Sequence, residues 1–274
     1  MRRNPFRKYR GFLKGSFLNV IAFRNEIIGW VVQDILTVII MVFMWFAIFK
    51  ENGGQTINGF TYPQMSAYLI IASLTANWTV NGSTFMDIND DIANGTIATS
   101  LTRPISYRAK NFFTSLGSNI GNFVIFFLPL IIIAYLVLIF GFKLPAPEPL
   151  NILFYLVSGF LAIAVLDSFD FIIAQLGFIT NSMFGIYLIK GSIFSFLAGS
   201  IIPYAYFPAW AQSFLSYLPF ASLGSTPVNI LLGRLSLAQV GISLALSVAW
   251  AIALYAFSLY ANKKMIRHVI SVGG

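Results

Sequence analysis

Long apolar runs with almost no charge dominate this sequence and limit what it can fold into. The first run, from about Ile27 to Phe49, is long enough to cross a hydrocarbon core as a helix. Hydrophobic residues make up 58% of the chain and charged residues 9%, whereas about a quarter of a soluble domain is charged. The sequence therefore predicts an all-α polytopic membrane protein, because a helix satisfies its own backbone hydrogen bonds in lipid.

Several classes of chemistry are excluded by the residues that are missing. The chain has no Cys, and its one His is His268. Disulfides, thiolate catalysis, His-dependent triads and zinc clusters are therefore not expected, and no metal site is predicted. No Gly-x-x-x-x-Gly-Lys-Ser/Thr loop is present, so the chain is not expected to bind ATP or to be an enzyme. No cleavage site follows the basic start of the chain, so no signal peptide is predicted.

Six transmembrane helices are predicted from the apolar runs. They cover about 27–49, 65–85, 112–140, 152–179, 183–202 and 238–261. The second half of the second span is polar, so this helix should face protein or a cavity rather than lipid. The third span contains Gly117 and Gly121, a small-xxx-small pair that is typical of close helix packing.

Three segments between or before the spans have patterns of their own. Residues 1–26 form a basic amphipathic helix, expected to lie at the membrane interface. Residues 86–110 form a polar loop, with a short helix before Gly95 and a second apolar face that Pro104 ends; an ordinary solvated loop would fit the same pattern. Residues 203–220, rich in Pro and aromatic residues, predict a re-entrant helical hairpin on the extracellular side before the last span.

Charge bias gives the expected orientation of the chain, which we treat as one transmembrane domain over residues 1–274. With six spans both termini lie on one side, together with the 86–110 loop. All 17 Lys and Arg then fall on that side except Lys50, Lys143 and Arg234. The positive-inside rule makes this side cytoplasmic. Topology thus explains the net charge of +8, and membrane lipids rather than nucleic acid are the expected partners.

Charged residues inside the predicted spans need partners. Asp170 and Lys190 lie at similar depth on neighbouring antiparallel spans, so they are expected to form an ion pair. A packing role for this pair is favoured over a substrate or proton site. Asp34 and Asp167 have no partner visible in the sequence. They are expected to face water in a central cavity or to lie at a subunit contact.

The order of these elements resembles the permease subunit of type 2 ABC exporters. Three stretches carry the resemblance: Ala22-Phe-Arg-Asn-Glu-Ile-Ile28, Asn94-Gly-Thr-Ile-Ala-Thr-Ser-Leu-Thr-Arg-Pro-Ile-Ser106, and Gly199-Ser-Ile-Ile-Pro-Tyr-Ala-Tyr-Phe-Pro-Ala-Trp210 with the Pro-Phe pair that ends at Phe220. The landmarks of the outer hairpin are Pro203, Pro208, Trp210 and Pro219. The resemblance covers nearly the whole chain and implies the plasma (inner) membrane of a prokaryote.

This resemblance implies a half-transporter. A second permease subunit, identical or paralogous, would complete the pathway, and two separate ABC ATPase subunits would bind ATP and Mg²⁺, so the chain itself needs no cofactor. The 86–110 loop would be the coupling helix that contacts the ATPase, and the N-terminal helix would be a second, weaker contact. The expected coupling residues are Ile88, Asp90, Asp91, Ile92, Gly95, Ile97, Arg103 and Pro104.

By analogy with the family, spans two and five would line the pathway. The expected residues are Ser73, Asn77, Asn81, Phe184, Tyr187, Phe194 and Leu197, a mixture suited to an amphipathic cargo. Phe residues are so frequent here that a Phe stripe is more often packed core or lipid-facing. The alternative function is an ion-coupled secondary transporter using Asp34, Asp167, Asp170 and Lys190, but spans one to three and four to six show no matching breaks.

Overall fold

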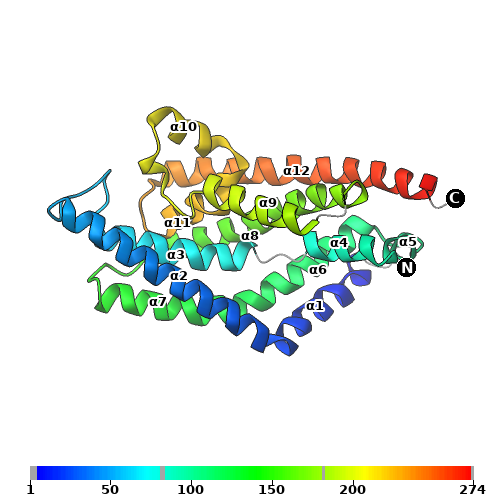
Figure 1. Ribbon diagram of the computed structural model, residues 1–274, viewed down its shortest axis with the longest axis horizontal. Helices are drawn as coiled ribbons and strands as arrows, with labels where there is room; N and C mark the ends of the chain where they lie inside the picture. Colours follow the sequence, from blue (N-terminus) through cyan, green and yellow to red (C-terminus); the bar gives the residue numbers. More distant parts are fainter. Residues whose placement is uncertain (1–4, 81–83, 181–182, 273–274) are drawn as a thin grey trace.

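The computed structural model describes residues 5–80, 84–180 and 183–272. Within these ranges the fold is helical, and the one β-bridge, between Ile57 and Phe60, is isolated. The predicted pathway residue Asn81 lies outside the described residues. Figure 1 shows an elongated bundle whose long helices run along one axis, with both chain ends at one extremity.

The first half of the chain contains the following elements. They are η1 (Pro5–Lys8), α1 (Arg10–Ala22), α2 (Arg24–Glu51), α3 (Tyr62–Val80), α4 (Thr84–Ala93), α5 (Thr96–Leu101), α6 (Tyr107–Asn122), the π-helical turn η2 (Phe123–Phe127) and α7 (Leu128–Phe140). The third predicted span is therefore one rod that begins five residues earlier than expected, at Tyr107. The second ends at Val80 rather than Phe85, because Phe85 belongs to α4.

The second half continues in the same way. Its elements are α8 (Pro149–Ala174), η3 (Gln175–Phe178), α9 (Met183–Leu197), η4 (Tyr204–Tyr206), α10 (Ala209–Tyr217), η5 (Pro219–Leu223), α11 (Ser225–Leu231) and α12 (Leu237–Val272). α9 is shorter than the predicted fifth span, and the chain turns at Gly199, whose φ of 72° suits glycine. α12 extends beyond the predicted last span and includes much of the expected C-terminal tail.

Four of the described helical segments are long and apolar enough to cross a membrane. They are Val31–Glu51, Tyr107–Phe140, Pro149–Phe178 and Leu237–Lys264. α9 is apolar but shorter, and α3, with its polar second half, is not among the four. The structure therefore supports a multi-pass membrane protein with four candidate spans, and the predicted count of six remains a prediction, as does the re-entrant nature of the 203–220 hairpin.

The core lies where α3 and α8 cross. Trp78 of α3 is buried, and its ring lies so close to Gly159 of α8 that a Cβ there would meet it at 2.1 Å. One turn away on each helix, the hydroxyls of Thr75 and Tyr155 form a 2.8 Å hydrogen bond. α3 is thus a protein-facing helix, as its polar composition predicts, and the buried hydroxyls of Thr75 and Thr79 find hydrogen-bond partners within the bundle.

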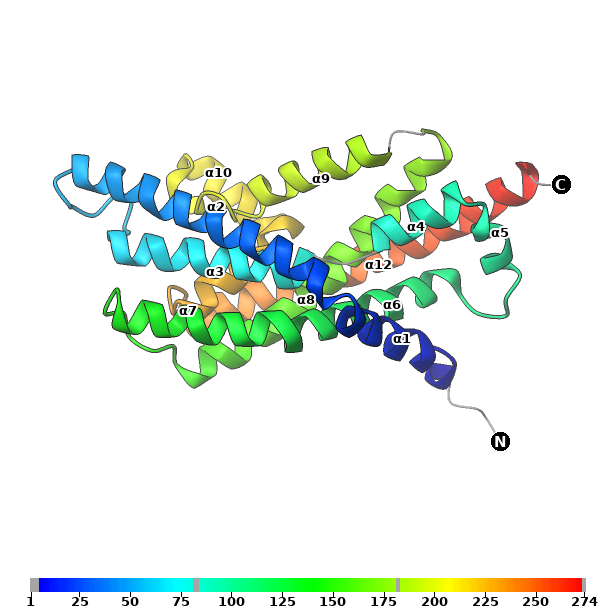
Figure 2. The same ribbon diagram turned by 60° about the horizontal axis from the view of Figure 1, so that its bottom comes forward.

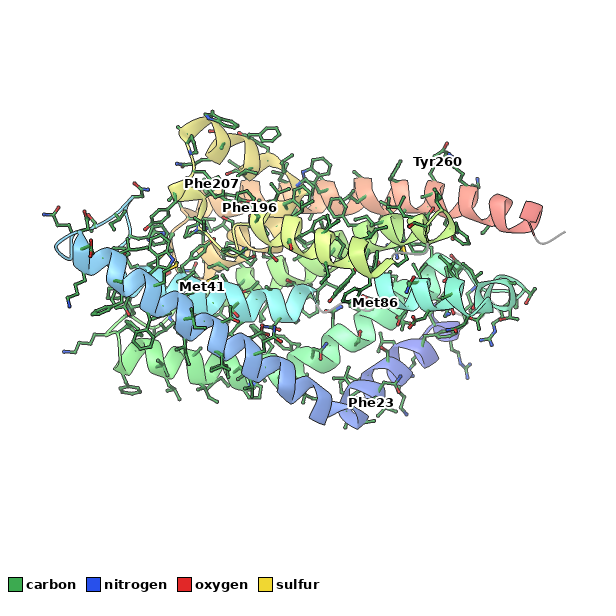
Figure 3. All side chains as sticks on the ribbon, in the orientation of Figure 1. Phe23, Met41, Met86, Phe196, Phe207 and Tyr260 are labelled. Atoms are coloured by element: carbon green, nitrogen blue, oxygen red, sulfur yellow. The ribbon has the colours of Figure 1, made fainter. Side chains whose placement is uncertain are left out.

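The outer surface of the bundle is apolar. Phe23, Phe196 and Tyr260 are all exposed, and Phe23 and Tyr260 point outward from opposite sides of the molecule (Figure 3). α2 exposes a continuous set of such residues, among them Ile40 and Phe43. A surface of this kind would drive aggregation in water but is compatible with lipid.

The basic N-terminal helix α1 packs against the bundle. α1 lies along α6, where Gly117 and Gly121 provide the close approach that the small-xxx-small pair predicts. A Cβ at Gly117 would lie 2.2 Å from the carbonyl oxygen of Leu13. The hydroxyl of Tyr9 accepts a 3.1 Å hydrogen bond from the backbone N–H of Ser106, so α1 is also fastened to the start of α6.

Candidate functional site

The polar segment between α3 and α6 folds as two short helices at the same end of the bundle as both chain termini (Figures 1 and 2). α4 is amphipathic, and α5 follows after Gly95, whose φ of 68° allows the chain to reverse. The side chain of Ser106 then caps α6 by accepting a hydrogen bond from the N–H of Ala109. The predicted helix, glycine stop and second helix are all present.

Asp91 fastens this segment to α6. Its carboxylate accepts hydrogen bonds from the hydroxyls of Thr96 at 2.7 Å and Tyr107 at 2.9 Å, and Lys110 lies 3.3 Å away. Burial alone would raise the pKa of Asp91. The hydrogen bonds from Thr96 and Tyr107 and the charge of Lys110 outweigh burial and hold the pKa below its usual value. Asp91 is therefore an internal connector of the α4–α5 segment.

The structure divides the predicted coupling residues into two groups. Ile88 is fully buried and Ile97 nearly so, in a cluster with residues of α6 and α8. Because Ile88 of α4 and Ile97 of α5 pack on the protein's own core, neither is exposed to a partner in this structure, and their role as direct contacts for an ATPase stays a prediction. Ile92 is partly buried beside the same cluster. The exposed members are Asp90, Gly95, Arg103 and Pro104.

A buried ion pair lies directly behind α4. The Arg108 guanidinium of α6 and the Asp167 carboxylate of α8 are 2.6 Å apart, and both side chains are almost fully buried. Arg108 also donates to the hydroxyls of Ser168 at 3.1 Å and Ser258 at 2.7 Å, so one side chain connects α6, α8 and α12. The expectation that Asp167 faces water or a subunit contact is therefore wrong. Its partner is Arg108, which lies within the segment 86–110 that was expected to be a loop.

The second buried pair is the one that the sequence predicts. Lys190 of α9 lies 2.7 Å from Asp170 of α8, and both side chains are buried. Asp170 follows Asp167 by three residues, so the two pairs lie one helical turn apart on α8. Together they hold α6, α9 and α12 to α8, and each charge has an opposite partner at contact distance.

α4 contacts both ion pairs through adjacent residues. The hydroxyl of Thr84 donates a 2.5 Å hydrogen bond to Asp167, and Lys190 lies 4.8 Å from the ring centre of Phe85, a cation–π distance. The exposed α4–α5 surface is therefore connected, through a single short helix, to charges buried between the long helices. This connection is not apparent from the sequence, where these residues are far apart.

Asp34 has a different environment from the other intramembrane charges. It is half-buried on α2, and its partner is the side-chain amide of Asn77 on α3. The same side-chain amide of Asn77 also donates a 3.2 Å hydrogen bond to the backbone carbonyl oxygen of Ser73. One predicted pathway residue, Asn77, is thus brought together with Asp34.

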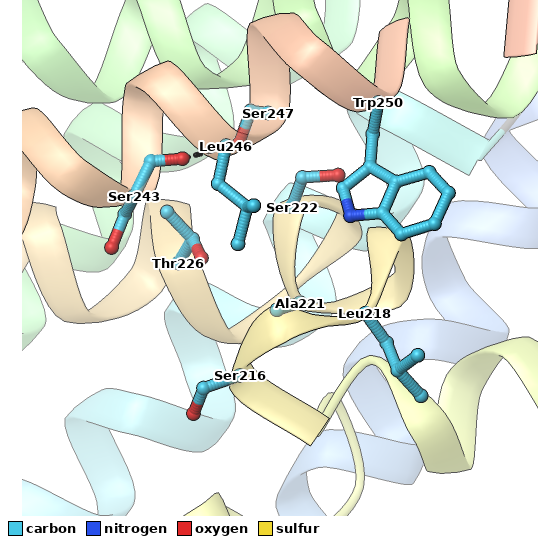
Figure 4. Close-up of a pocket in the computed structure, with 9 residues that line it drawn as sticks. All are labelled: Ser216, Leu218, Ala221, Ser222, Thr226, Ser243, Leu246, Ser247 and Trp250. Atoms are coloured by element: carbon cyan, nitrogen blue, oxygen red, sulfur yellow. Dashed lines mark hydrogen bonds between the residues drawn. The ribbon is translucent and has the colours of Figure 1, made fainter. Parts of the chain in front are cut away.

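The predicted pathway residues of α9 do not gather into one site. Phe184 and Tyr187 are exposed. Phe194 is instead part of the core, where its ring contacts those of Phe169 and Phe220, and Leu197 packs near the outer hairpin. The small hollow in Figure 4, between η5 and α12, has room for only about one water molecule. Among the described residues there is no cluster of side chains suited to a metal ion.

The outer hairpin projects from the side of the bundle, in the half away from the chain termini (Figure 1). Pro203 precedes η4 and is buried, Pro208 precedes α10, and Pro219 begins η5. Trp210 is 74% exposed, so α10 presents a large aromatic side chain outward. Aromatic residues of this kind are typical of the membrane interface.

These features define a helical, multi-pass membrane protein with a surface element joined to buried charges. Comparison with protein families is consistent with this class, since the family described as ABC-2 family transporter protein matches residues 35–273. The chain belongs to this family and is a permease subunit of an ABC transporter. No curated protein matches the sequence closely enough to count as a relative.

Proposed function

We propose that this chain is the transmembrane half of an ATP-driven exporter. It would pair with a second permease, a copy or a paralogue, and with two ABC ATPase subunits that bind ATP and Mg²⁺. The complex would move an amphipathic molecule, lipid-like, peptide or drug-like, outward across a prokaryotic plasma membrane. Family membership supports the ATPase partner, because ABC-2 permeases associate with such subunits.

The observation that carries this proposal is the double connection of α4 to the buried ion pairs. Thr84 reaches Asp167 and Phe85 reaches Lys190, so a displacement of α4 acts directly on α8 and α9. Because packed helices move as rigid bodies, a force on a short, well-anchored helix becomes a rotation or shift of the long ones. The exposed surface of Asp90, Arg103 and Pro104 is the proposed contact for the ATPase.

We propose the orientation of the complex from the distribution of its exposed cations. Exposed cations such as Lys14, Arg103 and Lys263 lie in α1, the α5–α6 turn and α12, near the end of the bundle that holds α4 and α5. The positive-inside rule favours the cytoplasm for this end, where ATP is available. The alternative, an ion-coupled transporter, would use Asp34, Asp167, Asp170 and Lys190. Asp167 pairs with Arg108 and Asp170 pairs with Lys190, so these three residues already have a structural role.

Co-purification tests the proposal. The chain is solubilised from its native membrane, and ATP hydrolysis by the co-purifying proteins is measured for wild type and for Asp90→Arg. We expect an ATPase to accompany the wild type, and the charge reversal to remove or uncouple it. The matched control is Glu51→Arg, an exposed charge reversal at the opposite end of the bundle, which should leave the ATPase bound. A wild-type preparation that never contains an ATPase would contradict the proposal.

A further inference from the structure

Within the described part of the chain, Asp34 differs from the other interior carboxylates because no cation is paired with it. Asp167 and Asp170 are each paired with a buried cation at contact distance. Asp34 lies in the candidate span Val31–Glu51, and among the described residues it has no ion pair. An isolated charge inside a membrane is strongly unfavourable. The single amide of Asn77 is a weak compensation for a full negative charge.

Further polar residues lie beside Asp34 on α2 and one turn from Asn77 on α3. Gln33 and Thr37 of α2 are exposed, and the Thr37 hydroxyl donates to the carbonyl of Gln33. Ser73 and Asn77 of α3 are half-buried. A patch of this kind is unfavourable against lipid tails, because nothing there replaces the hydrogen bonds of water. It is suited to a polar or charged group from another molecule.

The patch also has apolar neighbours on the same helix face. Val31 and Val38 lie three and four residues from Asp34, and both are half-buried. A ligand that places a charged head at Asp34 can therefore lay an apolar body along α2. The amide of Asn77 uses its N–H groups toward Asp34 and Ser73, which leaves its oxygen as a second acceptor.

We propose that Asp34, with Asn77, binds the cationic head group of the transported amphiphile. This inference rests on the proposed function and specifies its substrate class as amphiphiles that carry an ammonium or guanidinium group. The carboxylate supplies a charge-assisted hydrogen bond or ion pair, and Asn77 holds the carboxylate in place. The apolar residues of α2 accept the hydrocarbon part.

Binding of two related dyes tests this site. The probes are rhodamine 6G, a lipophilic cation, and rhodamine B, a related zwitterion. Their affinity for the purified full-length permease in nanodiscs is measured by fluorescence anisotropy, without any ATPase present. We expect wild type to bind the cationic dye more tightly, and Asp34→Asn to lose about tenfold in affinity for that dye alone. Asp34→Glu should retain most of the preference, because it keeps the charge.

The controls separate this proposal from other roles of Asp34. Glu51→Gln removes an exposed carboxylate at the far end of the same helix and should leave both affinities unchanged. Equal binding of the cationic dye by wild type and Asp34→Asn would overturn the proposal. It would also be overturned if Asp34→Asn changed only the oligomeric state, since Asp34 would then face a second copy. Because no ATPase enters the assay, these outcomes do not depend on whether an ATPase partner exists.

Discussion

Arg108 makes more polar contacts in the core than any residue that the sequence singles out. Its guanidinium pairs with Asp167, donates to Ser168 and Ser258, and lies 4.9 Å from the ring centres of both Phe171 and Tyr255. All of these partners are on α8 or α12, while Arg108 itself is on α6. One side chain therefore fixes the relative position of three long helices.

Removing this cation should destabilise the protein strongly. Arg108→Met leaves Asp167 buried without its partner, and breaking a buried pair in this way costs about 3–5 kcal/mol. We expect a loss of this size in unfolding free energy, measured by titration from mild detergent into SDS. The double variant with Asp167→Leu should recover part of the loss. A single variant as stable as the control Arg103→Met, which changes an exposed Arg, would contradict this account.

The two ion pairs also show what sequence reasoning can reach at the scale of residues. Asp170 and Lys190 are predictable, because their depths follow from counting residues back from a shared turn. Arg108 was missed because the third span was expected to begin at Phe112. The useful signal was Ser106 after Pro104, a helix cap that would have placed Arg108 inside the helix. Asp34 and Asn77 could not be matched, since sequence does not give the rotation of one helix against another.

At the scale of elements, the contact between α1 and α6 depends on Gly117. A larger side chain there would clash with the backbone of Leu13, so Gly117→Leu should undock α1 while α6 itself stays helical. Undocked α1 should be cleaved faster by trypsin after Arg10 and Lys14, because cleavage requires local unfolding. Gly15→Leu is the control, since open space surrounds that position. Equal cleavage rates in all three proteins would show that this packing does not hold α1.

The α4–α5 segment should loosen in acid because of Asp91. Its pKa is depressed in the folded protein, so its stabilising contribution is complete above the usual value of about 3.9 and is lost as the pH falls through the lowered value. The chain has no native Cys, so Ala98→Cys can carry a single environment-sensitive fluorophore on α5. We expect its signal to change as the pH falls below the usual pKa of a free Asp, about 3.9. In the Asp91→Asn background the step should be absent; a step that persists there belongs to another group.

The amphipathic pattern of residues 84–93 correctly predicts the helix α4. It does not predict which surface the apolar face of this helix packs against. Ile88 and Ile97 have the pattern expected of a docking surface, and they pack into the protein's own core. A helix that covers its own protein and one that docks on another have the same apolar spacing. Asp91 was similarly expected to contact the ATPase. Its carboxylate instead accepts hydrogen bonds from the hydroxyls of Thr96 and Tyr107, within the protein itself.

For the whole molecule, the arrangement predicts that α5 and the α2–α3 loop lie on opposite sides of the membrane. Ala98 on α5 and Asn52 in the α2–α3 loop are exposed, and these two elements lie at opposite ends of the bundle. Each is replaced by Cys in turn. A membrane-impermeant maleimide added to intact cells should label Asn52→Cys only, and permeabilised cells should show both. Labelling of Ala98→Cys in intact cells would reverse the assigned orientation.

The number of spans marks the limit of sequence reasoning at this scale. The first, third, fourth and last predicted spans correspond to the four long apolar segments of the structure. The second and fifth predicted spans correspond to α3 and α9. α3 is too polar, and α9 is too short, to be recognised as a membrane span from length and composition. α3 has polar groups because it lies inside the bundle, where Thr75 and Thr79 find hydrogen-bond partners. Hydropathy alone cannot distinguish such a buried helix from one outside the membrane.

The central claim is that an ATPase binds the exposed surface of the α4–α5 segment, which includes the turn at Arg103, and moves it. Site-specific photo-crosslinking tests this claim most directly. A photoreactive amino acid replaces the exposed Arg103, and the control is the same substitution at Asn52 at the opposite end. After illumination in native membranes, the account predicts an adduct with an ATP-hydrolysing protein at position 103 only, with a yield that changes when ATP and vanadate trap the motor. The absence of such an adduct at 103, or an equal yield at 52, would contradict it.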